Sequence, residues 1–201
     1  MKTFELVDEL FKIGCFKFGS YKLKNGMTTP FYIDLRLLIS YPELLVKISQ
    51  ALWEKISHIK FNRICGVPYN ALPIATVLSI HHRIPMLLKR KEVKEYGTKK
   101  KFEGLFDEND EVLIIEDVIV SGRSVIETIE PLEQSGLKIA HVAVIVDREQ
   151  GGRMILEKDG LHVTSLLTVT EIFHHLRLKG KISQQEIETV KRFIDTNQIV
   201  F

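Results

Sequence analysis

Two adjacent carboxylates, Glu116 and Asp117, end a β-rich apolar run and precede the small polar turn that contains Ser121, Gly122 and Ser124. Main-chain N–H groups of such a turn, with the positive end of the following helix dipole, can bind a phosphate without a lysine. The carboxylates suit ribose hydroxyls or a magnesium-bound ligand, because they accept hydrogen bonds and are hard oxygen donors. The segment therefore predicts a phosphosugar site. The alternative is an ordinary strand–turn–helix with a capped helix start.

A second feature is the basic run at residues 89–101, which reads KRKEVKEYGTKKK. Its cations outnumber Glu92 and Glu95, and Gly97 offers a pivot. An isolated run of this kind is usually a solvated surface loop. Beside a phosphosugar site it could instead supply mobile cations for a leaving pyrophosphate and exclude water as it closes.

Two other turns follow apolar runs. Arg148 carries a bidentate donor suited to a planar carboxylate or to the carbonyl edge of a pyrimidine, and the alternative is a surface ion pair with Asp147 or Glu149. The turn at residues 66–73 could present N–H groups to a pyrophosphate at the start of a helix, although Gly- and Pro-containing turns are common in α/β proteins.

Strand and helix patterns alternate along the chain and must position these residues. This alternation predicts an α/β fold with a parallel sheet and helices on both faces, whose ligands collect at the carboxyl ends of the strands. We expect one domain over residues 1–201 and a charged loop at 89–104. The expected strands are 63–67, 85–88, 111–119, 138–147 and 161–167, with short strands around Asn25 and Pro30. The expected helices are 3–14, 42–58, 71–81, 124–134, 152–158, 170–178 and 183–197.

The bulk composition is that of an ordinary globular protein, with 201 residues, 45% hydrophobic and 27% charged side chains and a net charge of +2. This charge is too small to indicate nucleic acid. Cys15 and Cys65 cannot build a disulfide scaffold, and we expect Cys65 to be reduced and buried. The acidic N-terminus does not resemble a signal peptide, and no apolar run reaches the roughly 18 residues of a membrane span. We expect a cytoplasmic protein.

Six segments together resemble the orotate phosphoribosyltransferases, which are type I phosphoribosyltransferases, and especially the transferase domain of UMP synthase. They are FGSYKLKNG, TPFYIDLR, CGVPYNALPIATV, RKEVKEYGTKK, LIIEDVIVSG and VDREQGG. The resemblance runs from about Phe16 to Gly152. It implies a type I fold with a small N-terminal hood, and transfer of a phosphoribosyl group from phosphoribosyl pyrophosphate (PRPP) to orotate, which gives orotidine 5′-monophosphate and pyrophosphate. It also implies Mg²⁺ carried by PRPP and a homodimer with shared active sites.

The same resemblance implies roles for individual residues. Catalysis would involve Lys94, Glu116 and Asp117, the last two beside the ribose hydroxyls. Orotate would be bound by Lys24 and Arg148, with Phe31 and Tyr32 beside the base. PRPP would contact the residues of the basic loop and the two turns: Tyr69, Arg90, Lys91, Lys94, Tyr96, Glu116, Asp117, Val120, Ser121, Gly122, Arg123 and Ser124.

Three positions depart from the family pattern. Val120 stands where many members have a threonine that holds the 5′-phosphate, and Asn70 where many have a PRPP-contacting lysine. Tyr96 replaces a histidine of bacterial members but also occurs in the UMP synthase type. No counterpart of the UMP synthase decarboxylase is expected within these residues, so the chain is either free-standing or one domain of a larger protein.

Two rival functions remain. The chain could transfer phosphoribose to another nucleobase, although Lys24 and Arg148 favour an acidic pyrimidine. It could also be a non-catalytic PRPP sensor, which would have less need for the cations of the basic loop. Nucleic-acid binding through 89–101 is not expected, because the run lacks interleaved aromatic residues other than Tyr96.

Overall fold

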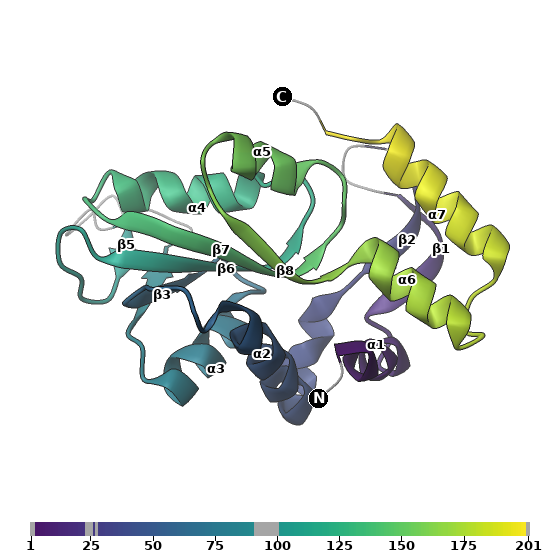
Figure 1. The fold of residues 1–201 in the computed structure, drawn as a ribbon, viewed down its shortest axis with the longest axis horizontal. Coiled ribbons are helices and arrows are strands. Elements are labelled where there is room, and N and C mark those ends of the chain that lie inside the picture. The colour runs from purple at the N-terminus through teal and green to yellow at the C-terminus, as the bar shows by residue number, and fades with distance from the viewer. Residues whose placement is uncertain (1–2, 23–25, 27, 91–100, 200–201) are drawn as a thin grey trace.

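Helices cover both faces of a mostly parallel sheet in the computed structural model, which describes residues 3–22, 26, 28–90 and 101–199 (Figure 1). The sheet has the strand order β5-β4-β3-β6-β7-β8. All neighbours are parallel except β4 and β5. Its strands are β3 (Arg63–Gly66), β4 (Met86–Lys89), β5 (Phe102–Glu103), β6 (Glu111–Ile119), β7 (Lys138–Asp147) and β8 (Val163–Thr168).

Helices α2 and α3 lie on one face of this sheet, and α4 and α5 lie on the other (Figure 1). The central strands are therefore covered on both sides, and residues 112–115 of β6 and 142–146 of β7 are fully buried. This burial explains why these strands read as continuous apolar runs rather than as an alternating pattern. The helices are α2 (Pro42–Ile56), α3 (Leu72–His82), α4 (Arg123–Glu133) and α5 (Gly152–Lys158).

A smaller unit, which we call the hood, stands beside the sheet (Figure 1). It contains the antiparallel strands β1 (Phe16–Lys22) and β2 (Thr28–Ile33) and the helices α1 (Thr3–Lys12), α6 (Val169–Leu178) and α7 (Gln184–Thr196). Phe31 of β2 packs edge-on against Phe173 of α6 and Phe193 of α7, with ring centroids 5.2 and 6.1 Å apart. The first strands and the last helices of the chain therefore form one packed unit.

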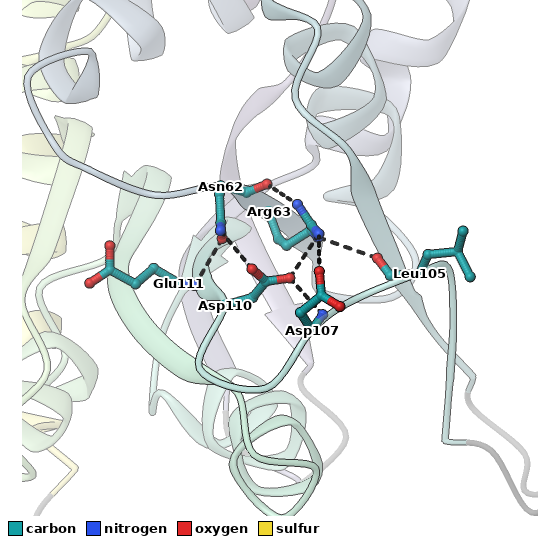
Figure 2. A network of polar contacts seen from close by, with 6 residues as sticks. All are labelled: Asn62, Arg63, Leu105, Asp107, Asp110 and Glu111. Atoms are coloured by element: carbon teal, nitrogen blue, oxygen red, sulfur yellow. Dashed lines mark hydrogen bonds and ion pairs between the residues drawn. The ribbon is translucent and has the colours of Figure 1, made fainter.

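A polar network fastens the amino ends of β3 and β6, at the edge away from the predicted turns (Figure 2). Arg63 Nη2 lies 2.8 Å from Asp110 Oδ2, and Arg63 Nε donates to the carbonyl of Leu105 at 3.3 Å. Asn62 donates to the other oxygen of Asp110 at 2.6 Å and accepts the N–H of Glu111 at 2.9 Å. The side chains of Arg63 and Asp110 are largely buried and hydrogen-bonded. The network therefore fixes the relative position of the amino ends of β3 and β6.

The predicted α/β fold is confirmed, and the predicted strands and helices are present with their ends shifted by at most two residues. Cys65 is buried and unpaired, as predicted. The prediction of a structureless loop over 89–104 was wrong at its end, because Phe102–Glu103 pairs with β4 as β5. A two-residue strand is too short to show a period of two in the sequence. The 3₁₀ helix η1 (Leu35–Ser40) was also not predicted.

Candidate functional site

The order of the strands marks one switch point of the sheet. From β3 the chain moves outward to β4, whereas from β6 it moves the other way to β7 and β8. Ligands of open α/β sheets bind at the carboxyl ends of the strands where the order reverses in this way. Here that point lies between β3 and β6, where Gly66 pairs with Ile115 and Val67 N donates to the carbonyl of Ile115 at 2.9 Å. Glu116 therefore sits at the first position of β6 beyond this pairing.

The turn after β6 has the geometry of an anion site. Gly122 adopts φ 74° as the N-cap of α4, a conformation that favours glycine, and Gly152 lies so close that a Cβ there would be 2.6 Å from the carbonyl oxygen of Val120. Gly152 N donates to that carbonyl at 3.0 Å, which holds the turn in place. The amides of Ser121, Gly122 and Ser124 have no acceptor within the described residues. They stand at the N-terminus of an 11-residue helix, where an anion is favoured.

The two carboxylates have different environments. Glu116 is 4% exposed, accepts from Ser124 Oγ at 2.5 Å and from the amide of Asp117 at 3.0 Å, and thereby links the strand to the turn. Burial, followed by the neighbouring charge of Asp117, raises the pKa of Glu116 to about 8. Asp117 is only half-buried. The pair thus combines a carboxyl group that is largely protonated at neutral pH with a carboxylate that remains accessible to a ligand.

Arg148 is a buried cation with unused hydrogen-bond donors. Arg148 is 7% exposed. Its Nη2 donates to Thr29 Oγ1 at 2.9 Å, and its guanidinium lies 4.4 Å from the ring centroid of Phe31. Its Nε is buried and has no partner within the described part of the chain. Burial lowers the pKa of Arg148 to about 10, so the group is still charged at neutral pH.

The surface ion pair considered for Arg148 is not formed with either neighbouring carboxylate. Asp147 accepts the N–H of Glu149 at 2.8 Å, and Glu149 accepts the N–H of Thr170 at 2.6 Å. In the described ranges, then, this guanidinium has no carboxylate partner at all. A buried charge without a counter-ion is costly, so its surroundings favour an anionic ligand.

Helix η1, which follows β2 of the hood, contributes a second cation, Arg36. Arg36 is clamped by Asp34, with Nε–Oδ1 and Nη2–Oδ2 distances of 2.6 and 2.8 Å, and it donates to Tyr32 Oη at 3.2 Å. Its hydrogen bond to Asp34 is the main cause that raises the pKa of Arg36, and Asp117 adds a smaller effect. The half-buried Tyr32 is thus held by Arg36, the cation whose pKa also responds to Asp117.

The other predicted site residues occupy several environments. Phe31 is fully buried beneath Arg148 and packs in the hood, so it supports the guanidinium from below. Tyr69 is 61% exposed on the turn after β3, and the Pro68–Tyr69 peptide bond is cis. Arg90 pairs with Glu103 at 2.5 Å, and Arg123 pairs with Glu127 at 2.8 Å. Four predicted residues lie outside the described residues: Lys24, Lys91, Lys94 and Tyr96.

Two residues that contact predicted site residues were missed by the sequence reasoning. Thr29 is fully buried, accepts from Arg148 and donates to the carbonyl of Phe31 at 3.0 Å. Thr29 lies in the family-like segment TPFYIDLR, but nothing in the sequence indicated its partner, which is 119 positions further along the chain. Arg36 was within a family-like segment, but nothing in the sequence indicated that Asp34 would orient it.

Comparison with known proteins agrees with this geometry. Residues 39–166 match the phosphoribosyl transferase domain family. The chain is 40% identical over 183 residues to an orotate phosphoribosyltransferase of Caenorhabditis elegans, which covers 90% of this chain and 81% of the relative. The chain therefore belongs to the phosphoribosyltransferase family and, within it, to the orotate phosphoribosyltransferases.

Bifunctional proteins are also among its relatives. The chain is 46% identical over 197 residues to bovine uridine 5′-monophosphate synthase, which covers 97% of this chain but 41% of that protein. The structure of Leishmania donovani UMP synthase superposes with a TM-score of 0.88 at 32% identity and covers 98% of this chain and 43% of that one. The chain thus spans about two fifths of the length of these synthases.

Proposed function

We propose that this chain is an orotate phosphoribosyltransferase that transfers the 5-phosphoribosyl group from PRPP to orotate in the de novo synthesis of UMP. One observation carries the proposal: the buried guanidinium of Arg148, which has no carboxylate partner among the described residues, follows β7 next to the end of β6, and the turn after β6 has amides without an acceptor in the same ranges. Orotate offers a planar carboxylate for the guanidinium, and PRPP offers a phosphate for the amides of the turn. Neither substrate alone would make use of both features.

The PRPP half of the site rests on the turn after β6. Its amides and the α4 dipole would bind the 5′-phosphate, with hydroxyls from Ser121 and Ser124, and no lysine is needed. Asp117 would accept a ribose hydroxyl, because its carboxylate is the accessible one of the pair. Glu116 would hold the turn through Ser124, since its own oxygens are already hydrogen-bonded at 2.5 and 3.0 Å.

The orotate half rests on Arg148. Its free Nε, together with the terminal nitrogens, can form a bidentate pair with the substrate carboxylate, and burial makes such a charge-assisted pair strong. Lys24 and Tyr32 would approach the same base from the hood. Phe31 would support the guanidinium by packing against it rather than touch the base, because its ring is fully buried there.

The chemistry requires no protein nucleophile. The C1–O bond to pyrophosphate breaks with its electron pair on the leaving oxygen, positive charge develops at C1, and N1 of orotate forms the new bond as its proton is lost to the departing pyrophosphate or to solvent. Rate enhancement would come from stabilising charge on the leaving group and from holding the reactants together. Arg90, Lys91, Lys94, Tyr69 and Tyr96 are the groups proposed to meet the pyrophosphate.

Magnesium would enter this site bound to PRPP rather than to protein ligands. The described residues contain no group of three or more metal-ligating side chains, and the accessible carboxylate of Asp117 is a single hard donor. When bound, Mg²⁺ would neutralise charge on the departing pyrophosphate. The protein's own part is then to position the PRPP that carries the ion.

We further propose that residues 1–201 act as one domain, that two copies form a homodimer with shared active sites, and that the enzyme works in the cytoplasm. The basic loop would reach the partner's site. No helix within the described residues is long and apolar enough to cross a membrane.

The test is an assay of orotate absorbance with PRPP and Mg²⁺, run also with each component omitted. We expect absorbance to fall only in the complete mixture, with one pyrophosphate released per orotate consumed. Uracil and hypoxanthine serve as comparison substrates. Faster turnover of either would indicate another nucleobase transferase, and binding of PRPP without pyrophosphate release would indicate a sensor.

A further inference from the structure

The turn that carries Arg148 has a backbone conformation that needs outside support. Glu149 adopts φ 57° and Gly151 adopts φ 98°, so a non-glycine residue in the left-handed region follows directly after the arginine. Such a conformation costs free energy and persists only where surrounding contacts impose it. Arg148 N donates to the carbonyl of Ile119 at 3.0 Å and Glu149 N donates to Asp147 Oδ1 at 2.8 Å, which fixes the start of the turn but leaves the carbonyls of Glu149 and Gln150 to other partners.

Those residues are held by the segment that follows α7. Gln198 Nε2 donates to the carbonyl of Glu149 at 2.8 Å, and Ile199 N donates to the carbonyl of Gln150 at 2.9 Å. In return, Gln150 Nε2 donates to the carbonyl of Asn197 at 3.1 Å from a side chain that is 5% exposed. Figure 1 shows the chain leaving α7 and running back towards α5, which begins just after this turn.

The holding segment is itself anchored to the hood. Gln198 Nε2 also donates to the carbonyl of Ile194 at 2.9 Å, and Asn197 Nδ2 donates to that of Phe193 at 2.8 Å. Phe193 packs against Phe31, whose ring lies under the Arg148 guanidinium. The end of α7 therefore reaches Arg148 from two sides, through the ring beneath the guanidinium and through the backbone of the turn.

We infer that residues 197–199 form a clamp that positions Arg148 for the carboxylate of the substrate, with Gln198 as its main positioning residue. This inference rests on the proposed function. The Gln198 side chain is the only link in which a clamp side chain donates to the turn, among the contacts of the described residues, and it holds the strained Glu149 directly. Loosening it would let the guanidinium move while the phosphate turn after β6 stays in place.

The test compares Gln198→Ala and Gln198→Glu with Gln184→Ala in the full chain. Glutamate keeps the size of the side chain but cannot donate to the Glu149 carbonyl. Gln184 is an exposed residue at the start of α7, the helix that precedes the clamp, where it donates to Glu188 at 2.9 Å, and it serves as the matched control. Both variants lose the hydrogen bond to the Glu149 carbonyl together with the one to the Ile194 carbonyl, so we expect the orotate KM to rise about fivefold or more in each. The kcat, the PRPP KM and the thermal midpoint should stay near those of the control.

Hydrogen exchange gives a readout without substrate, since amides in residues 149–152 should exchange faster in the Gln198 variants than in Gln184→Ala. Unchanged exchange, an unchanged orotate KM in an active enzyme, or a parallel loss of kcat, both KM values and thermal stability would each overturn the clamp. A wild-type protein with no orotate-dependent pyrophosphate release would instead contradict the proposed function.

Discussion

Arg148 donates through Nη2 to Thr29 Oγ1 at 2.9 Å, and this bond joins a turn of the main sheet to strand β2 of the hood. The Thr29 hydroxyl is itself fixed within the hood, because it donates to the carbonyl of Phe31. The position of the guanidinium is therefore set by both units of the fold. The proposed binding of orotate to Arg148 therefore requires the hood to be docked correctly against the sheet.

Replacing Thr29 by valine tests this relationship with little change of volume. The variant leaves Nη2 of a buried guanidinium without an acceptor, which costs about 1–3 kcal/mol. We expect the free energy of unfolding to fall by about this amount and the orotate KM to rise about 5- to 50-fold. Denaturant unfolding and steady-state kinetics measure the two effects. Thr28→Val, at an exposed neighbouring position, is the control, and equal orotate KM values in both variants would remove Thr29 from the site.

Replacing Arg148 by methionine should raise the orotate KM without lowering the free energy of unfolding. The variant removes a buried charge that has no carboxylate partner in the described ranges, so we expect the free energy of unfolding to stay level or to increase. The orotate KM should rise by about 100-fold, because a charged hydrogen-bond pair contributes about 1.5–3 kcal/mol. Arg153→Met, which breaks the exposed pair with Glu157, should change neither quantity by much. A large loss of stability in Arg148→Met would show a structural role instead.

Glu116 gives a prediction about pH. Burial and Asp117 raise its pKa from 4.5 to about 8, so the folded protein holds a proton over this range that the unfolded chain releases. Unfolding therefore becomes easier as the pH rises from about 4.5 to about 8. Glu116→Gln does not titrate and should lose less stability over that window. Urea unfolding at both ends of the window measures the difference, with the exposed Glu111→Gln as control. Parallel pH profiles for wild type and Glu116→Gln would refute the raised pKa.

Lys94 is proposed to stabilise the leaving pyrophosphate rather than to bind the base. For Lys94→Ala we expect kcat to fall about 100-fold or more while the orotate dissociation constant changes little, because removing one preorganised transition-state donor typically has an effect of this size. Steady-state turnover and equilibrium binding provide the two values. Lys101→Ala, which loses a contact to Gln134 Oε1 at 2.8 Å, is the matched control. Equal turnover in the two variants would exclude the catalytic role.

Local patterns predicted the fold and the strand, turn and helix around the acidic pair from sequence. Residues 111–124 contain a strand, an acidic pair and a turn in one continuous segment, so their arrangement depends on neighbouring residues alone. The Thr29–Arg148 bond and the Gln198 contact to Glu149 depend on how the hood docks, and they join residues 119 and 49 positions apart. Arg148 was singled out by its chemistry, but neither its burial nor its missing counter-ion could be deduced without knowledge of the packing around it.

The most direct test of the account is a crystal structure of the protein with orotate and PRPP. We expect the orotate carboxylate on the Arg148 guanidinium and the 5′-phosphate of PRPP against the amides of Ser121, Gly122 and Ser124. A complex in which neither ligand lies at the carboxyl ends of β3 and β6, or in which protein side chains occupy that place, would contradict the account.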